Sequence, residues 1–241
     1  MYERLNGVVL RTISYNDKNS IVRVYTDSHG LLSFLLPQSN GKTARMRRAL
    51  FQPLSLVEIE SDITANREIY RIREARCLVP LPSLHSHPVK NAVSLFITEL
   101  LSHVIVEEEP NAPLFAYISS SVQLLDRLEK GIANFHICFL YNLGIFLGIE
   151  PDTSTYTRGS RFDMLNGVFT TSIPAHSHFL HPEESEALMT LSRMSFANMH
   201  LFRFNRDQRR RLLDLIIGYY RLHNSAVGEI RSLDILTALF A

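Results

Sequence analysis

The stretch LLPQSNGKTARMRRALFQPL, residues 35–54, has four cationic side chains and no acidic one. The cations are Lys42, Arg45, Arg47 and Arg48. The triplet Gly-Lys-Thr at 41–43 also matches the end of the phosphate-binding loop of many nucleotide-binding proteins. The stretch therefore predicts contact with phosphate, either in a nucleotide or in the backbone of a nucleic acid.

The nucleotide hypothesis is weakened at the first glycine of that loop. The pattern G-x-x-x-x-G-K-[ST] requires glycine five residues before Gly41, and Leu36 occupies this position. Glycine is needed there because the backbone must curl its N–H groups around phosphate. A nucleotide-binding protein that uses 41–43 stays as an alternative, but the clustered cations favour salt-sensitive binding to a nucleic acid backbone.

Two further groups of cations are candidate DNA contacts. Arg11 and Lys18 are candidate supporting contacts in the N-terminal region. The segment 204–223 begins with a second group, Arg206, Arg209 and Arg210. Arginine at a helix N-terminus opposes the helix dipole, which suggests a second basic patch for DNA or for an acidic protein tail. A core helix with a solvated first turn is an equal alternative.

Motifs for catalysis are absent from the sequence, so we do not expect an enzyme. His176, His178 and His181 are close together, but no third type of ligand is fixed beside them, and a metal site is not expected. Cys77 and Cys138 have apolar neighbours, which predicts reduced, buried thiols without a disulfide or a Cys₄ zinc site. We expect no cofactor and no small-molecule substrate.

The first 80 residues predict five short strands, rich in β-branched and apolar residues and separated by turn residues. The predicted strands are 6–15, 20–26, 31–37, 53–61 and 68–79. Asn6-Gly7 is interpreted as a turn before the first strand. Five such strands, with the basic stretch as a long connection, predict a small barrel of the OB type. Tyr25 and Phe34 are expected in its core, and Tyr15 is a candidate for stacking on bases.

Beyond residue 80 the hydrophobic period becomes helical. Pro80, Pro82 and Pro88 predict a linker, which includes His85 and His87. The predicted helices are 93–104, 111–128, 132–147, one that opens at Pro182, one capped by Asn205 and Gln208, and 232–240. We therefore predict an α+β multidomain protein. It has an OB-fold barrel at 1–80 and an all-helical domain at 81–241, with an irregular insert at about 150–180.

The segment 131–149 has no charged side chain and is just long enough to cross a bilayer. It also contains Asn134, His136, Asn142 and three glycines, which favour the buried central helix of a soluble domain. The N-terminus has no apolar stretch typical of a secretory signal. We therefore expect a cytoplasmic protein that does not interact with a membrane.

Several segments, taken in order, resemble the RecO family of recombination mediators in DNA repair. The N-terminal ones are GVVLRTISYNDKNSIVRVYTDSHGLLSFLLPQ at 7–38 and FQPLSLVEIE at 51–60, on either side of the basic stretch. The later ones are ITELLSHVIVEEEPNAPLFAYI at 97–118 and NFHICFLYNLGIFLGIEPD at 134–152. The resemblance covers nearly the whole chain, and it depends on this succession of segments.

This resemblance implies a mediator without catalytic residues that binds single- and double-stranded DNA and anneals complementary strands. It also implies RecR as a partner in loading recombinase onto strands coated by single-stranded DNA-binding protein. The acidic C-terminal tail of that protein is expected to bind near Arg127 and Lys130. Many members hold zinc with four cysteines in the region that matches 150–174, where this chain has none. Either packing around Tyr156, Phe162 and Phe169 replaces the zinc subdomain, or the subdomain is lost, and in either case zinc is not expected. A protein-interaction scaffold without DNA binding is the remaining alternative.

Overall fold

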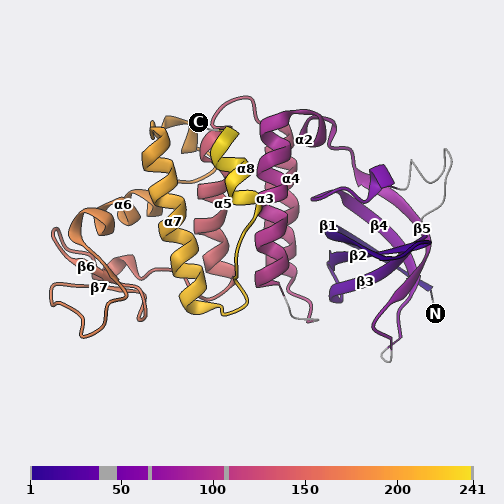
Figure 1. Cartoon of the computed structure of the whole chain (residues 1–241), viewed down its shortest axis with the longest axis horizontal. Helices are drawn as coiled ribbons and strands as arrows, with labels where there is room; N and C mark the ends of the chain where they lie inside the picture. Colours follow the sequence, from indigo (N-terminus) through magenta and orange to yellow (C-terminus); the bar gives the residue numbers. More distant parts are fainter. Residues whose placement is uncertain (1, 38–47, 65–66, 106–108, 240–241) are drawn as a thin grey trace. The chain divides into compact units, whose positions relative to one another are not determined.

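The computed structural model describes residues 2–37, 48–64, 67–105 and 109–239. Its N-terminal part is a closed barrel with strand order β1-β2-β3-β5-β4 (Figure 1). The strands are β1 (Tyr2–Asn16), β2 (Asn19–Thr26), β3 (Gly30–Pro37), β4 (Leu56–Asp62) and β5 (Tyr70–Val79). β3 and β5 pair in parallel, and the other neighbours pair antiparallel. The predicted five-stranded barrel is confirmed.

β1 is longer than predicted because it pairs with β4 along its first half and with β2 along its second. The interpretation of Asn6-Gly7 as a turn is wrong, since both residues lie inside β1. Gly7 pairs with Thr26 on one side and with Val57 on the other. A Cβ atom at this position would overlap Cγ1 of Val24, so glycine permits the close approach of β1 and β2 that closes the barrel.

The fourth strand begins at Leu56 rather than at the predicted residue 53. Leu54 has a φ of 60°, in the left-handed region that a strand does not use. Its side chain is completely buried, and its N–H donates to the carbonyl of Val9 at 2.8 Å. Burial and this hydrogen bond hold the turn that leads into β4.

The two aromatic residues expected in the core are buried. Phe34 lies inside the barrel, with its ring centroid 6.1 Å from that of Tyr70. Tyr25 is also buried, but it packs toward α4 (Ala112–Arg127), with its ring 6.2 Å from that of Phe115. Its hydroxyl donates to the carbonyl of Asn111 at 3.3 Å. Tyr25 therefore joins the barrel to the first helices, and neither ring is accessible for stacking on bases.

The predicted linker after the barrel contains a short helix, α2 (Pro82–Ser86), which leads directly into α3 (Pro88–Val104). The carboxylate of Asp126 in α4 accepts hydrogen bonds from the N–H groups of Ser83 and Leu84, at 2.8 and 2.7 Å. Carboxylates stabilise the positive end of a helix, which explains how so short a helix forms here.

The described chain forms two compact units. The first comprises Met1–Arg127 together with Ile230–Leu236. In it, the carboxylate of Glu99 on α3 accepts from the N–H groups of Arg231 and Ser232 and from the Ser232 hydroxyl. These bonds cap α8 (Ser232–Leu239) and attach the C-terminal segment to α3.

The second unit comprises Leu128–Glu229 and Thr237–Ala241. Its helices are α5 (Ile132–Phe146), α6 (Pro182–Ser192) and α7 (Arg206–His223). α5 is buried on nearly all sides, as predicted, and the Tyr220 hydroxyl of α7 donates to its Leu140 carbonyl at 2.7 Å. α7 begins with the predicted capping box of Asn205 and Gln208, and α6 begins at Pro182 as expected.

The insert before α6 contains a small three-stranded sheet that the sequence did not predict. Its strands are β6 (Arg161–Asp163), β7 (Val168–Thr170) and β8 (Phe179–Leu180), each too short to show a periodic pattern. Around it pack the three expected aromatic residues. The Phe162 and Tyr156 rings lie 4.9 and 5.1 Å from that of Phe169. Across the described ranges, none of the helices has the length and apolar character required to cross a membrane.

Candidate nucleic-acid interface

The basic stretch of the sequence lies partly outside the described residues. Lys42, Arg45 and Arg47 are in the gap between 37 and 48, as is the Gly-Lys-Thr triplet. Arg48 is described: it is exposed, and residues 48–50 are helical. The chain then rejoins the barrel at β1, where the Thr12 hydroxyl donates to the Phe51 carbonyl at 3.4 Å. The end of the basic stretch is thus anchored beside Arg11.

The outer face formed by β1, β2, β3 and β5 has an excess of positive charge. Arg11 on β1 lies directly opposite Arg23 on β2. Like charges in this position destabilise a sheet unless an anion lies between them. Arg71, on β5, extends the same face beside Leu35, and Lys18 lies in the turn between β1 and β2. We name these four residues, Arg11, Lys18, Arg23 and Arg71, the cationic wall. None of them forms a salt bridge within the described ranges.

The opposite situation is found on β4, the first half of β1 and the middle of β5. Arg76 donates to Glu58 at 2.8 Å, Arg73 donates to Glu60 at 2.7 Å, and Arg4 lies 3.6 Å from Glu60. The Arg73 guanidinium also covers the ring of Tyr2, at 4.5 Å from its centroid. We name this set, Arg4, Glu58, Glu60, Arg73 and Arg76, the ion-paired wall.

The Glu58–Arg76 pair of the ion-paired wall favours its charged form. The hydrogen bond from Arg76 lowers the pKa of Glu58 below its ordinary value of 4.5. The guanidinium groups of this wall already have carboxylate partners, so binding a phosphate would require breaking those pairs. The cationic wall has no such requirement, and it is the better candidate for phosphate contacts.

The sequence alone pointed to Arg11 and Lys18 but missed Arg23 and Arg71. The strand pattern of β2 places Arg23 on the outer face, since its neighbours Val22 and Val24 are buried. The sequence did not predict that Arg23 pairs with Arg11. Counting residues outward from the turn gives the wrong partner, because the register shifts between Ser14 and Asn16. Arg71 reaches the wall through the parallel pairing of β3 with β5, which a sequence pattern does not specify.

The second predicted group of cations, at the start of α7, divides into two kinds. Arg206 and Arg210 are exposed, and Arg210 lies 4.0 Å from Asp214. Arg209 is half-buried, and its guanidinium donates to the Phe204 carbonyl at 2.5 Å. Arg209 therefore helps to hold the start of the helix, whereas Arg206 and Arg210 stay as predicted contacts.

The residues predicted for binding a protein tail belong to different units. Arg127 is the last residue of α4 in the first unit, and Lys130 precedes α5 in the second. Both are exposed. They stay as predictions.

The histidines of the insert have structural partners. His176 Nε2 lies 3.3 Å from the Asp163 carboxylate, and His181 takes part in the capping box of α6 with Glu184. Within the described part of the chain, no group of three or more His, Cys, Asp or Glu side chains is placed to hold a metal ion.

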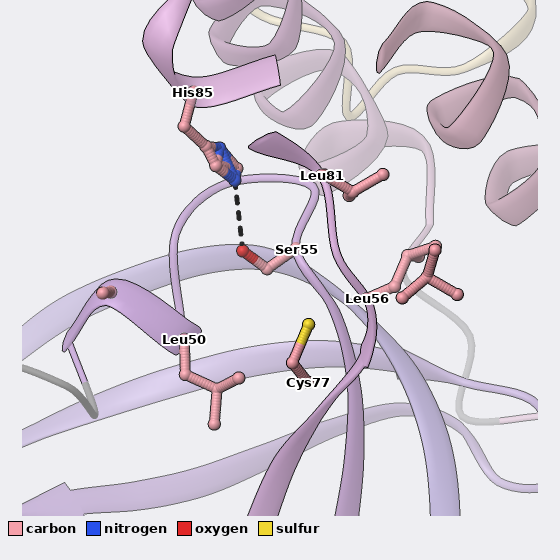
Figure 2. A pocket seen from close by; sticks show the side chains of 8 residues that line it. Leu50, Ser55, Leu56, Cys77, Leu81 and His85 are labelled. Atoms are coloured by element: carbon pink, nitrogen blue, oxygen red, sulfur yellow. Dashed lines mark hydrogen bonds between the residues drawn. The ribbon is translucent and has the colours of Figure 1, made fainter. Parts of the chain in front are cut away.

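A cavity of about 270 Å³ in the first unit is lined by Ala49, Leu50, Ser55, Leu56, Cys77, Val79, Leu81 and His85. Figure 2 shows this cavity from close by. His85 was predicted to be a linker residue, but it lies in α2. Its Nε2 is 3.3 Å from the Ser55 hydroxyl, and burial lowers its pKa. The expectation of two buried thiols holds for Cys138 and is wrong for Cys77, which is exposed. The lining of the cavity has no Lys, Arg, Asp or Glu, so the cavity offers little to a phosphate.

These features define a class of protein: an OB-type barrel with one uncompensated cationic face, followed by a helical region. Comparison with known families assigns the chain within this class. The model "Recombination protein O N terminal" matches residues 1–80, and "Recombination protein O C terminal" matches residues 85–227. The chain belongs to this family, as its sequence segments indicated.

Curated relatives agree with this assignment over the full length. A protein of Bacteroides fragilis named DNA repair protein RecO is 42% identical over 241 residues, which is 100% of both chains. The protein of the same name from Phocaeicola vulgatus is 39% identical, again over 100% of both chains. The one from Christiangramia forsetii is 30% identical over 97% of each. The family acts in DNA repair and recombination.

Proposed function

We propose that this protein is a recombination mediator in DNA repair that binds single- and double-stranded DNA and anneals complementary strands. With RecR, it helps to load recombinase onto strands coated by single-stranded DNA-binding protein. Membership of the family supports this role. The observation that carries the DNA-binding part is the cationic wall, whose arginines lack carboxylate partners within the described residues.

The proposed mechanism is electrostatic. Two single strands repel each other through their phosphates, and this repulsion is screened over about 8 Å at physiological ionic strength. Arg11, Arg23 and Arg71 neutralise the phosphates of one strand, and Lys42, Arg45, Arg47 and Arg48 supply further phosphate contacts. The second strand then approaches a complex of lower net charge. Annealing requires no bond to be made or broken by a side chain, so the role is non-enzymatic.

The protein partners are proposed on a different basis. The acidic C-terminal tail of single-stranded DNA-binding protein would be attracted by exposed cations such as Arg127 and Lys130. RecR follows from the family alone. A cytoplasmic location agrees with such a role.

A titration of a labelled single strand at two salt concentrations tests the proposal. We expect binding that weakens as salt rises, because each phosphate contact releases counterions. Replacing Arg45, Arg47 and Arg48 with alanine should weaken binding to every sequence and flatten the salt dependence. The matched control replaces Arg4, Arg73 and Arg76, which removes the same number of charges from the ion-paired wall and should change little.

Two other results would favour the alternative functions. Micromolar binding of ATP and Mg²⁺ by calorimetry, with no affinity for DNA, would indicate a nucleotide-binding protein that uses Gly41, Lys42 and Thr43. Absence of both DNA and nucleotide binding would indicate a protein-interaction scaffold.

A further inference from the structure

The cationic wall contains an apolar row as well as cations. Ile13 on β1 lies directly opposite Ile21 on β2, and Ile21 lies directly opposite Leu35 on β3. Leu35 in turn pairs with Arg71 on β5. Side chains that are directly opposite in a sheet lie on the same face, so these residues form one continuous line across four strands. We name Ile13, Ile21 and Leu35 the aliphatic row.

The row lies on the outside of the barrel. Ile13 is 39% exposed, while Ile21 and Leu35 are half-buried. Their sequence neighbours Val22 and Phe34 are completely buried, as expected for side chains that point inward. An aliphatic line on the outer face adds nothing to the barrel core, and it offers an apolar surface to a ligand.

Cations lie on two sides of the row. Arg11 and Arg23 form the neighbouring pair, two residues along each strand, at a spacing of about 6.7 Å. Arg71 lies at the end of the row. Tyr15, two residues beyond Ile13, is 59% exposed, and its ring makes no contact with another aromatic ring among the described residues.

This combination separates single strands from duplexes. A single strand presents phosphates on one side and unpaired bases, with apolar faces, on the other. In a duplex the base faces are stacked on one another and the outer surface is mostly phosphate and sugar. We infer that the aliphatic row and Tyr15 form a platform for the bases of single-stranded DNA, while Arg11, Arg23 and Arg71 hold its phosphates. Duplex DNA uses the cations alone.

The inference rests on the proposed DNA-binding function and assigns single strands to one part of this wall. It has a consequence for annealing. A base whose face lies against the row cannot stack within a duplex on that face at the same time, so the incoming strand must lift the bases from the protein. The platform thus orders the strand when its complement is absent and releases it when pairing offers a better arrangement for the bases.

The test compares matched variants and matched ligands, using the full-length protein. Ile13→Thr and Tyr15→Ala remove the platform, and threonine keeps the preference for strand structure. The controls are Leu78→Thr and Tyr2→Ala, at positions of similar exposure, 37% and 55%, outside the row. The ligands are a single strand, the corresponding duplex and an abasic single strand of the same length, which keeps every phosphate and lacks bases.

We expect the double variant I13T/Y15A to bind the single strand about tenfold more weakly, since it loses the stacking of a base on the Tyr15 ring. Its affinity for the duplex and for the abasic strand should change less than about twofold, and both controls should resemble the native protein. Melting temperatures by circular dichroism check that the barrel is intact.

Three results would overturn the inference. Equal losses for single strand, duplex and abasic strand would mean that the variants disturb phosphate contacts and not base contacts. No loss for any ligand, while R11A/R23A still weakens binding, would leave the proposed function in place without a base platform. If R11A/R23A also has no effect, the wall is not the DNA site at all, and the proposed location of DNA binding fails with it.

Discussion

The two walls of the barrel have similar numbers of arginines and opposite electrostatic character. On the ion-paired wall, Arg73 and Arg76 have carboxylate partners at 2.7 and 2.8 Å. On the cationic wall, Arg11 and Arg23 lie directly opposite each other with no salt bridge in the described ranges. Composition hides this contrast, because the formal net charge of the whole chain is +1. What matters for binding an anion is which cations lack an internal partner.

The proposed DNA site would explain the use of the ion pairs on the other face. Surface ion pairs contribute little to stability, on the order of 0–1 kcal/mol each. The pairs on Glu58 and Glu60 are therefore more useful as a means of neutralising arginines than as a source of folding energy. We propose that these carboxylates keep phosphate off the ion-paired wall, whereas the cationic wall has no salt bridge among the described residues that would do so.

Charge reversal on the cationic wall should give the largest effect on DNA affinity. Replacing Arg11 and Arg23 with glutamate removes two cations and adds two anions beside the bound phosphates. We expect affinity for single- and double-stranded DNA to fall by about 100-fold or more at 0.1 M salt. Fluorescence anisotropy with labelled strands measures this loss. Affinity within about threefold of the native protein would contradict the assignment.

Removing the carboxylates of the ion-paired wall should have a smaller effect, a gain in DNA affinity. The double variant E58Q/E60Q removes the carboxylates that hold Arg4, Arg73 and Arg76, and the freed guanidinium groups become available to phosphate. We expect duplex affinity to rise on the order of fivefold, with a steeper dependence on salt. Unchanged affinity in the same anisotropy assay would show that pairing is not what keeps DNA off this wall.

The effect of the ion-paired wall on DNA affinity should also depend on pH in a defined way. The hydrogen bond from Arg76 lowers the pKa of Glu58, so the pair is present above the ordinary value of 4.5 and is lost as pH falls through the lower, folded-state value. The ratio of the DNA affinities of E58Q and the native protein should thus stay constant between pH 7 and pH 5. A ratio that falls to one within this window would mean that Glu58 is already protonated and its pair broken.

The smallest effect on DNA is expected away from both walls. Burial acts to raise the pKa of Glu99, but hydrogen bonds from Ser232 and Arg231 outweigh it and lower the pKa overall. E99Q should reduce the free energy of unfolding by about 1 kcal/mol at pH 7, as for loss of a helix cap. The difference should disappear as pH falls through the lowered pKa of Glu99. Urea titrations measure it, and DNA affinity serves as the control that should not change.

Local sequence patterns predicted much of this fold. Runs of β-branched or other apolar residues marked all five barrel strands, and Asn205 with Gln208 marked the start of α7, because these signals act over a few residues. Gly7 was misinterpreted as a turn because the need for glycine arises from Val24 on another strand. Cys77 was misplaced because its exposure depends on the outer side of β5, which its apolar neighbours in the sequence do not specify.

The candidate site was predicted less completely. Arg11 was found as a cation, but its proposed importance comes from Arg23 across the strand and from the lack of a salt bridge to Arg11 among the described residues. Arg209 had the same sequence signal as Arg206, yet the bond to the Phe204 carbonyl gives it a structural role. The contacts that a cation makes in the folded structure distinguish a binding role from a structural one, and these contacts are not evident from the sequence.

We propose that DNA binds the cationic wall and not the ion-paired wall. The most direct test compares R11A/R23A with R73A/R76A, which remove equal charge from the two walls. Single-strand affinity is measured between 50 and 200 mM salt. For R11A/R23A we expect the slope of log affinity against log salt to flatten by about 1.4, and affinity at 0.1 M salt to fall about 25-fold. For R73A/R76A we expect both quantities to match the native protein. Equal changes in the two variants would show that DNA responds to net charge alone, and the distinction between the walls would be wrong.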